Sequence, residues 1–503
     1  MSDLPRDTDL SVQGRRILIP TILIFSGLSV WMAWVSEGFL ESDGVTHYLV
    51  RHFALERPVY WVDIWARPFC VVLYAMASYW GLFATRLMSL VVGLGVLGIT
   101  VLMTRAQKLT STGWAGFFLL TQPLFFAHSF SELTELPFAG LMGLVFLMYQ
   151  HRKFGWMALL AAISPMARPE GFGVILLTAI ALILHRKPHW ILVLPLGLIV
   201  WSWAGWQLFG GPKEYPWYRW LIENWPYSQE STYGRGSFFR LTVLLPAVIG
   251  PFAFPMIWLG AIRCLKVPDV LRCFLNDHDA RCRLLIPVIP MGVLGVHSVL
   301  WMMGKMASNG EPRYLLVVAP FWAILSAMGW EKFSQHLRIR HPIRWAMIGA
   351  LVPVIANLFY PVIPLGMTVD HQLARQVRHW LDSQTDHTRA GLRIASASPY
   401  VFLELNFDRL DQSKVVDSSQ QTVIRPPRNV LFIWDPIFSE KNADQGLVVT
   451  QDMLESHGWL LMNRVDEPKS GRYALIYRSP IYDLPAVSKT DTFSEPPPRG
   501  RRH

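Results

Sequence analysis

Long apolar runs, nearly free of charge, alternate with short polar connectors along the first 363 residues of the chain. Runs of this kind are typical of helices that cross or enter a lipid bilayer. Several runs are shorter than the roughly 17 residues that a perpendicular helix needs, so their ends must recruit aromatic residues or stop inside protein. The pattern predicts an α-helical polytopic membrane protein with about eleven spans, at residues 17–35, 87–103, 113–127, 136–149, 154–166, 172–184, 190–209, 241–262, 284–303, 314–330 and 345–363.

A further segment, residues 69–84, is apolar enough to be a twelfth span. Only Thr85 and Arg86 separate it from the next run. Counting it as a span would invert every later connector and place the most basic connectors outside, against the positive-inside rule. We therefore interpret residues 36–84 as one long outer segment, whose helices lie on the membrane or dip into it.

The composition supports a membrane location. The 503 residues are 52% hydrophobic and only 16% charged, whereas soluble domains are nearer a quarter charged. The net charge is +10, but the basic residues stand at the ends of apolar runs, where anionic lipid and membrane orientation explain them. The sequence therefore excludes an ordinary soluble enzyme and predicts no nucleic-acid partner.

Basic residues also indicate the orientation. If the N-terminus is cytoplasmic, the inner connectors hold twice as many Lys and Arg residues as the outer connectors before residue 364. The first run follows Arg15 and Arg16 and lacks a small-residue cleavage site, so we interpret it as a retained signal anchor. Residues 1–16 then form a cytoplasmic tail, and residues 17–363 form the membrane domain. The expected location is the bacterial cytoplasmic membrane, or the endoplasmic reticulum membrane in a eukaryote, with the active site on the non-cytoplasmic face.

After residue 363 the composition becomes that of a soluble protein. Residues 370–386 have helical periodicity, and helical segments are expected around Val401 and Met453. Residues 364–480 should form a small α/β domain outside the membrane, with strands at residues 392–395, 430–434 and 474–477. Asp435 ends a strand, where a loop cap is favoured over a functional carboxylate. The tail, residues 481–503, is rich in Pro and Arg and is predicted to be disordered.

Three of the four cysteines share one connector. Cys264, Cys273 and Cys282 lie near Asp277 and His278, which would suit a metal ion, but they form no C-x-x-C pair. We therefore interpret them as free thiols and predict no metal site. A second connector, residues 210–237, is crowded with Trp and Tyr. An interfacial aromatic belt is favoured there over a surface for stacking sugars.

Ionisable residues in the outer connectors carry the functional information. Glu41 and Asp43 lie with His47 just beyond the first run, where a solvated turn with a helix cap at Asp43 is the simplest interpretation. Charges held close to a membrane face are nevertheless functional candidates by default. Three more outer connectors carry such charges, at Glu132 and Glu135, at Arg168 and Glu170, and at Glu311 and Arg313. The last two pairs are explained equally well as structural ion pairs.

Carboxylates and arginines at one membrane face suit a particular reaction. A carboxylate can deprotonate a hydroxyl acceptor while cations hold a phosphate leaving group. A lipid-borne phosphate would lie at that depth. No metal is required in principle, because arginines can hold a monophosphate.

These motifs resemble those of the GT-C superfamily, the polytopic transferases that use polyprenyl- or dolichyl-phosphate sugars. Glu41-Ser42-Asp43 is similar to the ExD variant of its acidic first-loop motif. Other segments resemble its mannosyltransferase-like members: Trp65-Ala66-Arg67-Pro68, Arg86-Leu87, Ala167-Arg168-Pro169-Glu170-Gly171 and Pro312-Arg313-Tyr314-Leu315-Leu316. The resemblance covers residues 15 to about 363.

The resemblance implies a GT-C-like membrane fold and a catalytic role for Asp43, with Glu41 in support. It implies transfer of a sugar from a lipid-phosphate donor to a hydroxyl acceptor on a glycan, lipid or protein, by direct displacement and without a cofactor. The substrate-binding residues that follow from it are His47, Glu132, Glu135, Arg168, Glu170 and Arg313.

Three other functions compete with sugar transfer at this point. A transporter or flippase tends to show duplicated halves with broken helices in matching positions, which we do not find in the sequence. A polysaccharide ligase would use similar acceptors but a lipid-diphosphate donor. A membrane scaffold without catalysis would leave the charges at the membrane face unexplained.

The charge distribution predicts that the N-terminus is cytoplasmic and that residue 364 onward is not. Protease added to sealed right-side-out cells or spheroplasts should then remove the C-terminal domain, as followed with a C-terminal epitope. Complete protection of that epitope in intact cells would overturn this orientation.

Overall fold

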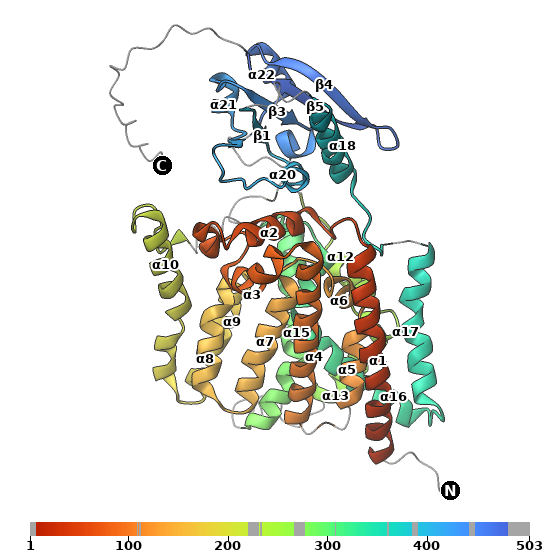
Figure 1. The fold of residues 1–503 in the computed structure, drawn as a ribbon. Helices are drawn as coiled ribbons and strands as arrows, with labels where there is room; N and C mark the ends of the chain where they lie inside the picture. The colour runs from red at the N-terminus through yellow and green to blue at the C-terminus, as the bar shows by residue number, and fades with distance from the viewer. Residues whose placement is uncertain are drawn as a thin grey trace. The chain divides into compact units, whose positions relative to one another are not determined.

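The computed structural model describes residues 7–107, 109, 112–219, 231, 234–265, 277–306, 308–359, 362–384, 391–441 and 448–480. The chain divides into two compact units, one ending at Thr368 and the other beginning at Val369 (Figure 1). The predicted disordered tail, residues 481–503, lies outside the described residues.

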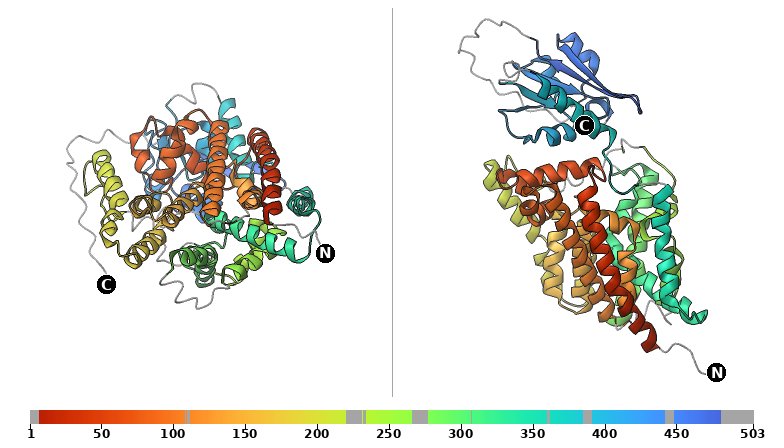
Figure 2. Two further views of the ribbon diagram at one scale, coloured as in Figure 1. Left: turned by 90° about the horizontal axis from the view of Figure 1, so that it is seen from below. Right: turned by 45° about the vertical axis from the view of Figure 1, so that its right-hand side comes forward.

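The first unit is a bundle of helices, and each predicted apolar run coincides with at least one of them. Helix α10 lies at one margin of the bundle and α17 at the opposite margin (Figures 1 and 2). The elements are α1 (Asp7–Val35), α2 (Ser42–Phe53), η1 (Pro58–Val62), α3 (Pro68–Tyr79), α4 (Leu82–Ala106), α5 (Thr112–Leu120), α6 (Pro123–His128), α7 (Glu135–Gln150), α8 (Phe154–Ile163), η2 (Ser164–Met166), α9 (Gly171–Leu184), η3 (Pro188–Val193), α10 (Leu196–Phe209), α12 (Arg240–Ile249), α13 (Ala253–Leu265), α15 (His278–Met303), η5 (Pro312–Val318), α16 (Ala319–His336) and α17 (Pro342–Phe359).

Five of the helical stretches are long and apolar enough to cross a membrane, and the chain is an integral membrane protein. They are Val12–Val35, Leu82–Ala106, Pro188–Phe209, His278–Met303 and Pro312–His336. The bent pair of α12 and α13 makes up to six spans. The remaining apolar helices have 10–17 residues, so the prediction of eleven complete spans is not confirmed.

Two predicted runs are interrupted by proline. The run at 241–262 breaks into α12 and α13, whose axes differ by 104°. Gly250, with a φ of 97°, and Pro251 stand at the break, and neither residue favours a continued helix. The run at 113–127 breaks between α5 and α6, just before Pro123. Single helices over these two runs were therefore wrong predictions.

Helix α16 forms the centre of the bundle and is buried on almost every side, as expected for a helix that is apolar all round. It packs closely against α13. A Cβ atom on Gly260 would lie 2.1 Å from the Leu325 carbonyl oxygen, and one on Gly329 would lie 1.9 Å from the Met256 carbonyl oxygen. The two glycines let the backbones touch, which is how many membrane helices associate.

The outer segment, residues 36–84, contains α2, η1 and α3, so the helices expected there are present. Helix α3 has 12 residues and ends at Tyr79, before Gly81, whose φ is 108°. It is therefore a short helix separate from α4, in agreement with our decision not to count it as a span.

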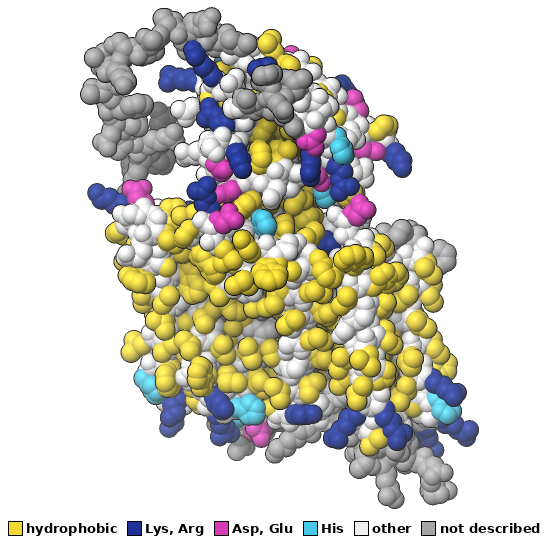
Figure 3. Space-filling model, viewed as in Figure 1, with side chains coloured by type: hydrophobic (Ala, Val, Ile, Leu, Met, Phe, Trp, Pro, Cys, Tyr) yellow, Lys and Arg dark blue, Asp and Glu magenta, His cyan; other side chains and the backbone are white. Residues whose placement is uncertain are grey.

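Charged and apolar side chains are segregated along the first unit. Figure 3 shows a broad face of apolar side chains, with Lys and Arg gathered along its lower edge. Helix α2 and the start of α7 lie at the opposite end of the bundle in the same view (Figure 1). The acidic motif and this group of basic side chains thus occupy opposite ends of the bundle. Cys70, Cys264 and Cys282 are buried free thiols, while Cys273 lies outside the described residues.

The second unit is a five-stranded sheet in the order β2-β1-β3-β5-β4 with helices beside it. Strand β1 pairs in parallel with β2 and β3, and β5 pairs antiparallel with β3 and β4. Its core includes Phe432, Trp434, Trp459 and Tyr477. The elements are α18 (Val369–Ser383), β1 (Arg393–Ser396), α20 (Pro399–Leu405), β2 (Val415–Val416), α21 (Gln420–Ile424), β3 (Val430–Trp434), η6 (Ile437–Lys441), α22 (Gln451–Ser456), β4 (Leu460–Glu467) and β5 (Arg472–Arg478).

The predicted helices and strands of the second unit are confirmed, but β2 and β4 were not predicted. Strand β4 begins with three exposed apolar residues and has a bulge between Leu461 and Asn463, so it lacks the alternation that marks a half-buried strand. The Asp435 carboxylate accepts hydrogen bonds from the backbone N–H groups of Ile437 and Phe438 at 3.0 and 2.8 Å. The loop-cap interpretation of Asp435 is therefore confirmed.

Candidate active site

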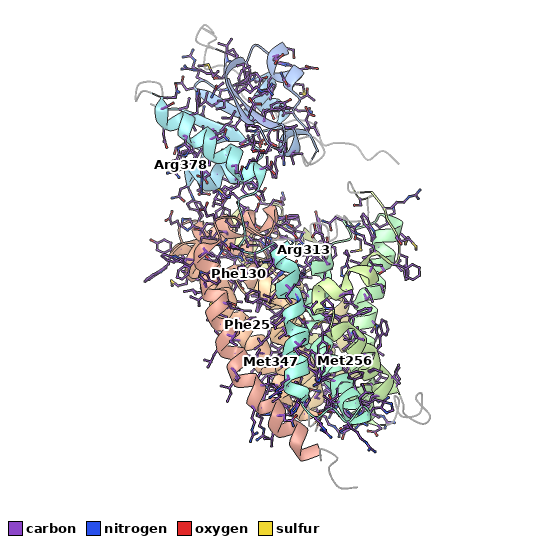
Figure 4. All side chains as sticks on the ribbon, turned by 90° about the vertical axis from the view of Figure 1, so that its right-hand side faces the viewer. Phe25, Phe130, Met256, Arg313, Met347 and Arg378 are labelled. Atoms are coloured by element: carbon purple, nitrogen blue, oxygen red, sulfur yellow. The ribbon has the colours of Figure 1, made fainter. Side chains whose placement is uncertain are left out.

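Arg313 joins the acidic motif to two other outer connectors. It follows Pro312 at the start of η5, where proline suits the first helical position. Its Nη1 lies 2.8 Å from Glu41 Oε2, and its Nη2 lies 2.8 Å from Asp43 Oδ2. Its Nε contacts Glu311 and lies 3.7 Å from Glu135 Oε1. Figure 4 shows Arg313 at the same end of the bundle as Phe130 and far from Met256.

The acidic motif is placed by the start of α2. Glu41 is the N-cap residue with extended backbone, and Asp43 lies in the first turn of the helix. Asp43 is therefore not the helix cap that the simplest interpretation of the sequence suggested. A carboxylate in the first turn is favoured by the helix dipole. Its side chain is instead held by Arg313, 270 residues further along the chain.

Arg168 extends the same network. Its Nη1 lies 2.7 Å from Glu135 Oε1 and donates to Thr134 Oγ1 at 2.9 Å, and its Nη2 lies 2.9 Å from Glu170 Oε1. Glu135 thus contacts both arginines. We call the connected set the carboxylate–arginine cluster, and its members are Glu41, Asp43, Glu135, Arg168, Glu170, Glu311 and Arg313.

The two short-range pairs foreseen as structural ion pairs, Arg168 with Glu170 and Glu311 with Arg313, both form. Each arginine also contacts acids from other elements, so these pairs are parts of a larger network. Burial of a charge is unfavourable unless it is paired and hydrogen-bonded. The network therefore fixes four separate connectors against one another.

Two predicted site residues lie beside this cluster. Glu132 is fully buried and pairs with Arg86, with its Oε1 2.8 Å from Arg86 Nε. His47 is buried on α2 and forms no ion pair within the part of the chain that the structure describes. Burial, reinforced by the positive charge of Arg51, lowers the pKa of His47 well below its usual value. The His47 imidazole is therefore neutral at physiological pH.

Five carboxylates share two guanidinium groups in the cluster. Removal from water raises the pKa of Glu41 to about 8, although Arg313 opposes the rise. Burial likewise raises the pKa of Glu311. Both acids thus shift toward their neutral forms, which reduces the excess of negative charge.

Exposure differs among the acids of the cluster. The Asp43 side chain is 33% exposed, whereas that of Glu135 is 1% exposed. Asp43 can therefore meet a substrate from outside, while Glu135 holds the two arginines in place. No three His, Cys, Asp or Glu residues among those described are grouped so as to hold a metal ion.

Solved structures share this architecture. ArnT from Cupriavidus metallidurans bound to undecaprenyl phosphate matches 91% of this chain and 97% of its own, with a TM-score of 0.59 and 13% sequence identity. Its apo state gives a TM-score of 0.57 and 12% identity over 90% and 97% of the two chains. Both are GT-C membrane glycosyltransferases.

The chain has the GT-C fold. An archaeal oligosaccharyltransferase, AglB from Archaeoglobus fulgidus in complex with an inhibitory peptide and a dolichol-phosphate, is also similar. Its TM-score is 0.50 at 12% identity, over 94% of this chain and 75% of that chain. No protein-family model and no curated protein matches the sequence. The resemblance to the GT-C superfamily is thus confirmed at the level of the fold.

Sequence reasoning missed two histidines and one arginine at the site of this GT-C fold. His297 of α15 lies 3.9 Å from Glu170 and stacks on Tyr314, and His128 lies 3.9 Å from Glu135. His297 interrupts the predicted run 284–303, and His128 directly follows the predicted run 113–127. An ionisable residue inside or at the end of an apolar run was the signal that would have found them. Arg86 was noted only as part of a motif.

In the aromatic connector, residues 210–237, Trp217 and Tyr218 are exposed. Trp220, Trp225, Tyr227 and Tyr233 lie outside the described residues.

The raised pKa of Glu41 predicts a pH-dependent stability. Between the ordinary value of 4.5 and about 8, the folded protein binds a proton at Glu41 that the unfolded chain has lost, so thermal stability should fall as pH rises through this window. Glu41→Gln should remove this part of the pH dependence, measured by thermal unfolding in detergent from pH 5 to pH 8. Glu56→Gln, at an exposed acid of the same outer segment, is the matched control and should keep it. Equal slopes for wild type and Glu41→Gln would contradict the prediction.

Proposed function

We propose that the protein is a membrane glycosyltransferase that moves a sugar from a polyprenyl-phosphate donor to a hydroxyl acceptor on the non-cytoplasmic face. The observation that carries this proposal is the pairing of Glu41 and Asp43 with Arg313 at one end of a GT-C fold. A carboxylate that can act as a base and a cation that can face a phosphate stand side by side there. The mannosyltransferase-like motifs make polyprenyl-phosphate mannose the first donor to test.

The similar structures support the donor class. One holds undecaprenyl phosphate and another holds dolichol-phosphate, so both bind a polyprenyl monophosphate. For this chain we propose the same class of lipid carrier. The acceptor is a glycan, a lipid or a protein, and AglB was solved with a peptide.

We propose that Asp43 is the general base. Its Oδ2 pairs with Arg313, and Oδ1 would take the proton from the acceptor hydroxyl. As that proton leaves, the acceptor oxygen bonds to the anomeric carbon, and the bond from that carbon to the phosphate oxygen breaks. The lipid phosphate departs with the bonding electron pair. Glu41 shares Arg313 with Asp43 and supports its position.

Arg313 and Arg168 would stabilise the departing phosphate. Arg313 carries five N–H donors. Its Nε faces Glu311 and Glu135, while Nη1 contacts only Glu41 and Nη2 only Asp43 among the ion pairs of the described residues. Each terminal nitrogen has a second N–H that can point to a phosphate oxygen. Glu135 and Glu170 fix the orientation of Arg168, which makes its guanidinium group a preorganised electrostatic partner. His47, neutral and on the same helix as Asp43, is proposed to contact the substrate.

Glu132 is the weakest of the predicted substrate-binding residues, because its carboxylate is fully buried against Arg86. The rival functions differ from the proposal in ways that can be measured. A flippase would move a lipid-linked substrate without changing its bonds, and a ligase would require a lipid-diphosphate donor. A transfer assay that includes both donor classes separates these possibilities.

Asp43→Asn should lower transfer by about 10²- to 10⁴-fold, because the amide keeps the size of the side chain but cannot accept the proton. Glu41→Gln should lower it less. The assay uses purified protein in liposomes with a panel of polyprenyl-phosphate and polyprenyl-diphosphate sugars. Asp63→Asn is the matched control, because its oxygen can still accept the hydrogen bond from the Ala66 N–H group at 2.6 Å. Near-normal turnover of Asp43→Asn with every donor would remove Asp43 from the mechanism.

Replacement of Arg168 or Arg313 by Ala should weaken use of the donor, and replacement by Lys should restore it only in part. Lysine keeps the charge but loses the planar fork that bridges several oxygens. The measurement is KM for the lipid-phosphate donor beside thermal stability. An unchanged KM with lowered stability would show that these arginines only hold the structure together.

A further inference from the structure

Arg86 is a fully buried cation outside the carboxylate–arginine cluster. It lies near the start of α4 and is 1% exposed. Its Nε donates to Glu132 Oε1 at 2.8 Å. Its two terminal nitrogens turn to the backbone instead: Nη1 donates to the carbonyl oxygens of Ser36 at 2.6 Å and Ala33 at 3.3 Å, and Nη2 donates to that of Gly38. One side chain thus binds three carbonyl groups and one carboxylate.

The three carbonyls belong to the part of the chain that leads into the acidic motif. Helix α1 ends at Val35 and α2 begins at Ser42, and we call residues 36–41 between them the acidic link. The last carbonyls of a helix lack partners within it, and a cation is favoured there by the helix dipole. At the end of α1, Arg86 both donates hydrogen bonds to such carbonyl groups and provides the positive charge. Its guanidinium group also lies over the Phe39 ring, 5.8 Å from the ring centre.

The opposite side of the acidic link is held as well. The Gly38 N–H group donates to the Leu365 carbonyl at 2.9 Å, and the Leu365 N–H group donates to Ser36 Oγ at 2.9 Å. A Cβ atom on Gly38 would lie 1.9 Å from the Gly366 carbonyl oxygen. Only glycine fits in that position, so the link has little room to shift away from Arg86.

The far end of α2 is tied to the same place. Arg51, on the last turn of α2, donates from Nη1 to the backbone carbonyl of Glu132 at 2.6 Å. Glu132 therefore accepts a hydrogen bond from Arg86 at its carboxylate and another from Arg51 at its backbone carbonyl. Helix α2, which carries Asp43 in its first turn, is anchored at both ends to one connector.

We infer that Arg86 is a positioning residue for sugar transfer: it fixes the acidic link so that Glu41 and Asp43 face Arg313. Within the described part of the chain, Arg86 forms no hydrogen bond or ion pair with either acid, and it acts through the backbone that leads to them. The inference rests on the proposed function. A displacement of about 1 Å at a reacting group can lower a rate by about 10²-fold, so the link is where a small loss of support has a large effect.

The test is Arg86→Lys. Lysine keeps the charge opposite Glu132 but cannot bridge the carbonyls of Ser36 and Gly38 at once. We expect kcat to fall by about tenfold to a hundredfold, with a smaller change in KM for the donor. Hydrogen–deuterium exchange of the peptide that covers residues 36–43 should rise at the same time.

Glu331→Gln is the matched control. Glu331 is also buried and pairs with Arg263 at 3.1 Å, but on α16 and α13 away from the acidic link. This variant should lose thermal stability while kcat and exchange at residues 36–43 stay as in the wild type. A kcat of Arg86→Lys within threefold of the wild type would overturn the inference, and so would an equal loss in Glu331→Gln at matched thermal stability. If the wild type transferred no sugar from any donor, the proposed function would fail, and exchange at residues 36–43 alone would decide whether Arg86 fixes the link.

Discussion

The burial of charge at one end of the helix bundle governs how the first unit is arranged. Arg313 contacts acids at the start of α2, at the start of α7 and in its own connector. The acid at the start of α7, Glu135, also contacts Arg168. Water cannot fully solvate these groups, so each must find a partner of opposite charge. Apolar helix surfaces alone are compatible with many packing arrangements. The charge pairs join the helices at one end in a single arrangement. The charges to which we assign the proposed reaction also specify how the helix ends meet.

A second support works through the backbone. The acidic link leaves α1 without regular structure, and its course is set by Arg86 on one side and by Leu365 and Gly366 on the other. This division of roles separates the reacting acids from the residues that hold them. A carboxylate meant to accept a proton should stay partly exposed, whereas its support is most effective when buried and hydrogen-bonded. Asp43 is partly exposed, and Arg86 is fully buried and hydrogen-bonded.

The sequence predicted the features that depend on local pattern. Long apolar runs located the helices of the first unit, and short apolar segments after residue 363 located β1, β3 and β5. It did not show that Arg313 reaches Asp43 or that Arg86 reaches Glu132, because these partners are far apart in sequence and nothing in local periodicity pairs them. It missed the break at Gly250 and Pro251, although both residue types were visible, because hydropathy alone was continuous across them. Strand β4 escaped notice because its exposed Leu460, Leu461 and Met462 hide the alternation.

An excess of carboxylates would repel a phosphate, so the ionisation of the cluster matters for the chemistry proposed. With its pKa raised to about 8, Glu41 is mostly neutral near pH 7, and burial pushes Glu311 in the same direction. Less negative charge then surrounds the two arginines of the cluster than five ionised carboxylates would give. Glu135 and Glu170 pair with Arg168, and Asp43 pairs with Arg313. In the proposed reaction this lower negative charge would favour the approach of an anionic donor, and the partly exposed Asp43 would accept the proton.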